Sequence, residues 1–264
     1  MGRNSKEPKI VIFDIETSPI IIPTFSLWDD AKGNHDAILQ DWFVISVAWK
    51  ELGEKKVHSI SVLDGAKEKG WDHTDDSAVV ATIHHVLMEA DIIVGHNIAK
   101  FDWKKLNTRF IKYGLPPLPK KKMADTYRIA KREFNFTSNR LDYIADFLGI
   151  EGKMDTPKGL WLQVLKGDRK AVKTMETYNR QDVVVSENVY LALRPYDTSP
   201  INMSAHAESM VCPTCGGKHH QARGYTVLAT GKYHRYSCTD CGAWFRGKEN
   251  LLSSATRKSL TVAQ

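Results

Sequence analysis

All four cysteines of the 264-residue chain lie in its last quarter, as two Cys-x-x-Cys pairs. The pairs are Cys212/Cys215 and Cys238/Cys241, with 22 residues between them. Such an arrangement is typical of one Zn²⁺ held tetrahedrally by four thiolates, because each pair supplies two sulfurs. Disulfide or redox pairing is the alternative, and it fits less well in a chain without a secretion signal. We therefore expect one structural Zn²⁺ whose four sulfur ligands leave no open position for catalysis.

The 22 residues between the pairs read as two short strands around a Gly231-Lys232 turn. A β-hairpin between two cysteine pairs predicts a small β zinc ribbon, which we place at residues 210–248. Turn-forming residues dominate 196–209, so we expect a linker there. Residues 249–264 are polar and lack periodicity, so we expect a tail.

Residues 1–195 have the pattern of one α/β domain. Hydrophobic residues make up 42% of the chain and charged residues 26%, which excludes wholesale disorder. Alternation predicts strands at 9–17, 43–51, 56–63 and 91–95, and helical periodicity predicts helices at 75–90, 101–113, 139–149 and 168–193. A hairpin followed by alternating helices and strands predicts a mixed β-sheet covered by helices.

Two carboxylates lie near the end of the first predicted strand. Because side chains alternate along a strand, Asp14 and Glu16 share a face with Ile10 and Ile12. Sites of α/β proteins usually form at the carboxyl ends of such strands. A catalytic or metal-binding role is therefore indicated for this pair.

The helix predicted at 168–193 carries two polar groups, Tyr178 and Asp182, on its apolar stripe; the other members of the stripe are Ala171, Met175, Val185 and Val189. A further acid, Asp102, begins the helix after strand 91–95. A salt bridge or helix cap is the simpler interpretation of any single acid. Four acids in this arrangement favour Mg²⁺ or Mn²⁺, which prefer hard oxygen ligands. Two such ions ~3.5–4 Å apart polarise a phosphodiester and generate hydroxide.

Three motifs carry a family resemblance: Asp14-Ile-Glu16, Asn97-Ile-Ala-Lys-Phe-Asp102 and Tyr178-Asn-Arg-Gln-Asp182. They resemble the three motifs of the DnaQ-like, or DEDD, 3′–5′ exonucleases, in the same order over residues 9–193. Tyrosine four residues before the last aspartate resembles the tyrosine branch of that family. Residues 13–19 and 141–149 also look like family-B polymerase proofreading domains, and the nearest likeness is to stand-alone bacteriophage exonucleases.

The resemblance implies a ribonuclease H-like fold and a two-metal mechanism. It implies that the four acids of the motifs bind two Mg²⁺ or Mn²⁺ and that Tyr178 orients the attacking water. It also implies contacts from Thr17, Asn97 and Phe101 to the terminal nucleotide. The residues themselves leave a strand-end cap, a helix cap and a core position open for these three.

Charge is distributed unevenly along the chain. Residues 100–140 carry 12 basic and 3 acidic side chains, and residues 201–264 have a net charge of +5, within a total of +6. Two basic segments favour a nucleic-acid partner, although a solvated lysine-rich surface gives the same count. We expect Lys104, Lys105 and the run 120–122 to contact phosphates. Aromatic residues of the 18–41 insertion and its border either stack on bases or pack the loop; they are Phe25, Trp28 and Trp42.

We therefore expect a metal-dependent 3′–5′ exonuclease that prefers single-stranded DNA 3′ ends and acts in phage DNA replication, repair or recombination. In this reading the ribbon aids substrate capture. RNA 3′-end trimming is the alternative within enzymes, and a nucleic-acid-binding adaptor whose ribbon docks a replication protein is the alternative outside them. The length excludes a complete replicative polymerase, so any proofreading would act in trans. Without a long apolar run or a signal core, we expect no membrane partner and a cytoplasmic location, in the host cytoplasm for a phage protein.

Overall fold

The structure, a computed structural model, describes residues 7–24, 35–64, 71–152 and 157–261. The chain divides into two compact units. The larger comprises Lys9–Lys131 and Asn135–Tyr190, and the smaller Met1–Pro8, Arg132–Phe134 and Leu191–Gln264. Among the helices of the described residues, none has the length and apolar character needed to span a bilayer.

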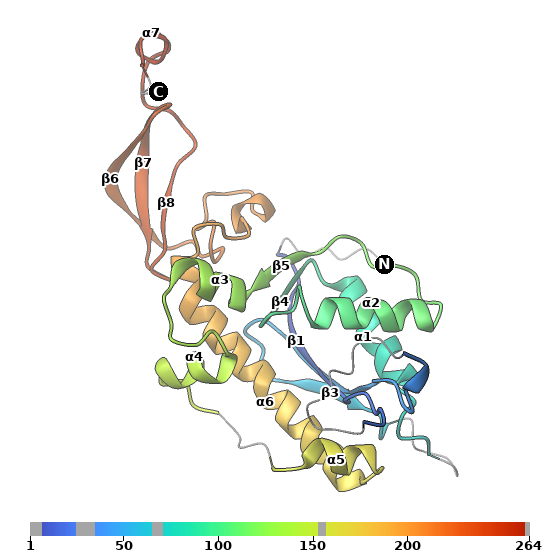
Figure 1. Cartoon of the computed structure of the whole chain (residues 1–264). Coiled ribbons are helices and arrows are strands. Elements are labelled where there is room, and N and C mark those ends of the chain that lie inside the picture. The colour runs from blue at the N-terminus through green and yellow to red at the C-terminus, as the bar shows by residue number, and fades with distance from the viewer. Residues whose placement is uncertain (1–6, 25–34, 65–70, 153–156, 262–264) are drawn as a thin grey trace. The chain divides into compact units, whose positions relative to one another are not determined.

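A five-stranded mixed sheet forms the centre of the larger unit (Figure 1). Its strands are β1 Ile10–Thr17, β2 Val44–Glu51, β3 His58–Ser61, β4 Ile92–Gly95 and β5 Lys122–Asp125, in the order β3-β2-β1-β4-β5. The pairs β1–β2 and β2–β3 are antiparallel, whereas β1–β4 and β4–β5 are parallel. The predicted mixed sheet covered by helices is therefore confirmed.

One face of the sheet packs on helices α1 (Ser77–Glu89) and α2 (Asp102–Lys112), which lie together in Figure 1. Val11, Phe13 and Ile15 of β1 belong to the core on this side and are almost fully buried. The three share one face because side chains alternate along the strand. Burying such side chains contributes about 1.5–3 kcal/mol each, so this face supplies much of the hydrophobic stabilisation.

The start of α1 is fixed by the fully buried carboxylate of Asp76. It accepts a hydrogen bond from the Val44 N–H at 2.8 Å, pairs with Arg109 of α2 and accepts the Tyr113 hydroxyl. A buried carboxylate is tolerated only with such partners. The network ties β2, α1 and α2 together.

Helix α6 (Arg169–Leu193) covers the other face of the sheet, where polar bonds accompany its buried apolar side chains, among them Val172 and Met175. Lys50 of β2 forms a buried ion pair with Glu187. Nearer the start of the helix, Glu176 accepts the Ser59 hydroxyl of β3 at 2.6 Å. These bonds fix the position of α6 along and around its own axis relative to the sheet.

Within residues 1–195 the described structure contains one strand and two α-helices that the sequence patterns do not predict: β5, α3 (Thr126–Glu133) and α5 (Leu160–Leu165). Strand β5 has four residues and α3 has eight, so both are shorter than the window over which a periodic pattern becomes recognisable. The helix predicted at 139–149 is shorter, as α4 Leu141–Phe147.

The 18–41 insertion is described only in part. It contains a 3₁₀ turn, η1 His35–Ala37, and an isolated bridge between Ile21 and Gln40. Of the three aromatic residues predicted to stack on bases or to pack, Phe25 and Trp28 lie outside the described residues, and Trp42 packs against the core.

The smaller unit contains an antiparallel sheet in the order β6-β7-β8. Its elements are η2 Arg194–Tyr196, η3 Met203–His206, β6 His220–Leu228, β7 Gly231–Cys238, β8 Trp244–Arg246 and α7 Ser254–Lys258. The predicted hairpin is present as β6 and β7, but its turn lies at residues 229–230, and Gly231 already begins β7. The predicted tail, whose sequence lacks periodicity, contains the short helix α7, capped by Ser253.

Candidate active site and metal centres

Three carboxylates converge at the C-terminal end of β1. Asp14 and Glu16 share a face of the strand, and Asp182 comes from α6. One oxygen of each lies within 4.8 Å of an oxygen of the others. The β1–β2 register shifts between Glu16 and Thr17, a bulge of the kind that re-aims side chains beside sites. Carboxylate oxygens so close together fit a divalent cation.

The fourth predicted acid, Asp102, begins α2 and is 2% exposed. Its carboxylate accepts a hydrogen bond from the backbone N–H of Ile15 at 3.3 Å. This bond holds Asp102 beside β1, because Ile15 lies between Asp14 and Glu16 in the strand. The charge of Asp102 acts on both of these acids. The close trio does not include Asp102, which borders it.

Burial raises the pKa of all four acids. The pKa of Glu16 rises to about 8, that of Asp102 to about 7 and that of Asp182 to about 6, in each case chiefly through desolvation. Burial and then the charges of the other three acids raise the pKa of Asp14 well above its ordinary value. Without a cation the cluster therefore keeps protons near neutral pH. A bound divalent ion inverts this preference by stabilising the carboxylates.

Two neighbours on α6 orient the cluster. The Tyr178 hydroxyl donates a hydrogen bond to Asp182, which opposes the rise of that pKa. The Asn179 amide donates to Asp14 at 2.7 Å and accepts the Ser46 hydroxyl at 3.2 Å, with no exposed surface of its own. Sequence reasoning missed Asn179, although it lies four residues after Met175 on the buried stripe.

Asp125, at the end of β5, is a second residue that the sequence did not reveal. Its buried carboxylate accepts the backbone N–H of Asn97 at 2.9 Å and that of Ala99 at 3.4 Å. Asn97 has a φ of +61°, which asparagine tolerates better than most residues. Both ring nitrogens of His96 are hydrogen-bonded, to Thr126 and to the Asn139 carbonyl. These bonds give the loop before Asp102 a defined shape.

Three of the predicted substrate contacts lie together beside the acids. Lys105 donates to the Thr17 hydroxyl at 3.1 Å, and its ammonium lies 5.1 Å from the ring centre of Phe101 and 4.1 Å from that of Trp42. Phe101 is 42% exposed, so it is not the core residue that the sequence left open. Lys104 is exposed on α2, and no contact brings it into this group.

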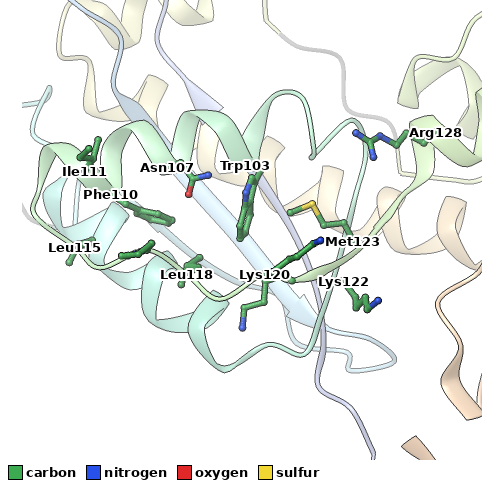
Figure 2. Close-up of a pocket in the computed structure, with 12 residues that line it drawn as sticks. Trp103, Asn107, Phe110, Ile111, Leu115, Leu118, Lys120, Lys122, Met123 and Arg128 are labelled. Carbon is green, nitrogen blue, oxygen red and sulfur yellow. The ribbon is translucent and has the colours of Figure 1, made fainter. Parts of the chain in front are cut away.

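The lysine run 120–122 lies elsewhere. Lys122 pairs with Ile92, and Ile92 with Ile10, so it is level with the start of β1, four residues or roughly 13 Å before Asp14. Lys120 and Lys122 instead flank a groove of about 910 Å³ whose floor includes Trp103 and Phe110 (Figure 2). The lysines at 120–122 are therefore near Asp102 in the sequence but far from the acidic cluster in the fold.

The four cysteines of the smaller unit form one cluster. The Sγ atoms of Cys212 and Cys241 are 3.8 Å apart, and those of Cys215 and Cys238 are 3.7 Å apart. Tetrahedral Zn²⁺ with ligands at ~2.3 Å requires sulfurs roughly 3.8 Å from one another. The cluster therefore fits a zinc site.

Comparison with known proteins places these features in context. The sequence model of the RNase H superfamily matches residues 42–194 of this chain. A search of curated proteins finds no match. Among solved structures, the family B DNA polymerase from the hyperthermophilic archaeon Pyrobaculum calidifontis is similar, with 17% identity and a TM-score of 0.49 over 72% of this chain. The similar region spans 25% of that polymerase. This match covers more than half of the chain, so the chain belongs to the RNase H superfamily.

Proposed function

We propose that the larger unit is a metal-dependent 3′–5′ exonuclease that hydrolyses phosphodiester bonds at DNA 3′ ends, with single-stranded ends preferred. The observation that carries the proposal is the convergence of Asp14, Glu16 and Asp182, bordered by Asp102, at one end of β1. RNase H superfamily domains are typically nucleases. We assign the tyrosine branch because Tyr178 donates to Asp182.

The acids would hold two Mg²⁺ or Mn²⁺, and each residue then has a distinct role. When bound, such ions supply an activated water and stabilise the leaving 3′ oxygen. Asp14, Glu16, Asp102 and Asp182 provide the oxygen ligands. Tyr178 orients the attacking water through its hydroxyl, and the Asn179 amide restricts the rotation of Asp14.

The terminal nucleotide is proposed to lie against the group formed by Thr17, Phe101 and Lys105. Phe101 offers a ring for the terminal base, and Lys105 a charge for its phosphate. Asn97 is held by Asp125 at the edge of the same site. Lys104 extends the positive charge along α2.

We assign residues 1–195 to the nuclease domain, 196–209 to a linker, 210–248 to a zinc ribbon with one structural Zn²⁺, and 249–264 to a tail. In this proposal the ribbon increases substrate capture. Deleting 201–264 would then weaken DNA binding while leaving turnover at saturating substrate unchanged. Unchanged affinity with slower turnover would contradict that role.

The test uses oligonucleotides labelled at either end, as single-stranded DNA, duplex DNA and RNA, with Mg²⁺, Mn²⁺ or EDTA. We expect a stepwise ladder from the 5′-labelled single strand, absent in EDTA and in Asp14→Asn. The control variant is Glu54→Gln, which removes an exposed carboxylate in the β2–β3 turn. Hydrolysis that survives Asp14→Asn refutes the site, and faster degradation of RNA than of DNA replaces the substrate with the RNA alternative. Binding without hydrolysis under every condition favours the adaptor alternative.

A further inference from the structure

The smaller unit has an unusual surplus of positive charge around its sheet. Residues 210–248 contain six lysines and arginines and one acid, Asp240. That carboxylate accepts the His219 ring N–H at 2.8 Å, and no ion pair joins it to an arginine of the described residues. The cations of the sheet contact aromatic rings, backbone carbonyls and, for Arg223, the Gln221 side-chain amide oxygen.

Two of these cations oppose each other directly on one face of the sheet. Arg235 of β7 is paired in register with Arg246 of β8. Like charges at such a cross-strand position are destabilising. Neither side chain has a carboxylate partner in the part of the chain that the structure describes. An anion bound between the two strands would offset this repulsion.

The same face carries an aromatic ring that is open to solvent. Trp244 is paired with Ser237, two residues from Arg235 on β7, so alternation places it beside the arginine pair. Its side chain is 58% exposed, and the Arg235 guanidinium lies 5.2 Å from its ring centre. Arg246 lies 4.3 Å from the ring centre of Tyr233. Guanidinium groups that alternate with rings are suited to a ligand with both phosphates and flat bases.

Backbone bonds hold the arginines in place while leaving donors free. Arg235 donates from Nε to the Arg223 carbonyl at 3.0 Å, and Arg246 donates to the Gly247 carbonyl at 3.0 Å. Arginine has five N–H donors, so most remain for a phosphate. Arg223 lies at a bulge beside Gly224, whose φ is +76°. The bulge allows this carbonyl to support Arg235.

We propose that this face of the zinc ribbon, formed by Arg235, Trp244 and Arg246, binds a single strand of DNA. The arginines contact successive phosphates, and the indole of Trp244 stacks on an unpaired base. A duplex has no unstacked base to offer, which favours a single strand. The choice of DNA rests on the proposed exonuclease function, whereas the arrangement of charge and ring does not.

The experiment measures the affinity of the full-length protein for a fluorescein-labelled oligo(dT) of about 20 nucleotides by fluorescence anisotropy, without added Mg²⁺ or Mn²⁺. The test variants are Arg235→Gln/Arg246→Gln and Trp244→Ala. The matched control, Lys218→Gln/Lys232→Gln, removes two charges from elsewhere in the same unit. Zinc content and circular dichroism establish that each variant keeps its ribbon.

We expect the arginine variant to lower affinity at least tenfold and to reduce the slope of log K against log [salt] by roughly 1.4, because each phosphate contact contributes about 0.7. Trp244→Ala lowers affinity about tenfold, and the control changes it less than threefold. Equal losses in the control and the arginine variant overturn the proposal. Duplex DNA that binds as tightly as oligo(dT), or RNA that binds more than tenfold more tightly, also overturns it. Absence of binding by the parent protein overturns it too, and is the result expected for a ribbon that docks a protein.

Hydrolysis at saturating oligonucleotide is measured in parallel with Mn²⁺. The ribbon variants should hydrolyse at the parental rate, because none of them alters the acidic cluster. If the parent protein binds oligo(dT) through this face but hydrolyses nothing, the exonuclease proposal fails while the binding face stands. Hydrolysis by all variants without any change in affinity overturns the binding face alone.

Discussion

Glu16→Gln should stabilise the larger unit when no divalent cation is present. The pKa of Glu16 rises from 4.5 to about 8 in the native state, through burial and then the charges of Asp182 and Asp102. An acid with a raised native pKa binds protons more readily in the native than in the unfolded state. Native stability therefore falls as pH rises from about 4.5 to about 8. Glutamine carries no charge at any pH and removes this loss.

The size of the effect follows from the pKa change. At 1.36 kcal/mol per pKa unit, the rise at Glu16 corresponds to roughly 4–5 kcal/mol if the group titrated alone. Two effects reduce this value. The neighbouring carboxylates share protons with Glu16, and water screens part of the charge repulsion because the Glu16 side chain is half-buried. We expect a gain of about 2 kcal/mol at pH 8, or an increase in Tm of roughly 4–8 °C, and almost no gain at pH 4.5.

The assay is urea unfolding of the parent and Glu16→Gln between about pH 4.5 and 8.5. Each series is run without divalent cation and with Mg²⁺ or Mn²⁺ at about 5 mM. Added cation should stabilise the parent more than the variant, because the variant has lost a ligand. Glu54→Gln is the control and should follow the parent. A pH-independent difference between parent and variant, or a variant that is less stable than the parent at pH 8 without cation, would refute the reasoning.

Three further substitutions test other parts of the molecule. Lys50→Met should cost about 3–5 kcal/mol, because it leaves the buried Glu187 carboxylate without its cation and with only the Gly53 N–H as a donor. Adding Glu187→Leu should restore most of this stability. Urea unfolding in which the single variant matches the parent contradicts this. Asp125→Ala should leave the N–H of Asn97 without its acceptor, costing about 1–3 kcal/mol and speeding its hydrogen exchange, and unchanged exchange counts against it. Cys238→Ser should abolish stoichiometric zinc and unfold the β6–β8 sheet; a folded ribbon without zinc, seen by NMR, would be inconsistent with a structural metal.

The elements that the sequence predicts well are those with strong periodic patterns. Strand β1 alternates cleanly, and that alternation alone places Asp14 and Glu16 on one face. Helix α6 has a long apolar stripe, which places Asp182 toward the sheet. The zinc site is predicted from the spacing of the cysteines within each Cys-x-x-Cys pair, which is local information. In each case the information lies within a few turns or one strand, so tertiary structure is not required to read it.

The features that escaped prediction depend on contacts between distant segments. Asn179 and Asp14 are 165 residues apart, and nothing local indicates that an amide would meet that carboxylate. Asp125 ends a four-residue strand within a basic segment, and its partners lie 26–28 residues earlier. The position of Lys122 at the opposite end of the sheet from the acids follows only from the β4–β5 register. Local patterns place side chains on faces, but strand order decides which faces meet.

The polar contacts under α6 explain how one helix can deliver a metal ligand accurately. An apolar helix–sheet interface tolerates small slides, because hydrophobic contacts are not directional. Hydrogen bonds and ion pairs are directional, and those of α6 reach β1, β2 and β3 through Asn179, Glu187 and Glu176. Asp182 lies between two of these fixed points. A rotation of α6 by one residue, about 100°, would break both bonds and carry Asp182 away from Asp14 and Glu16. The apolar residues of α6 hold the helix against the sheet, and these directional bonds fix its rotation, so that the three carboxylates stay within ligand distance of one another.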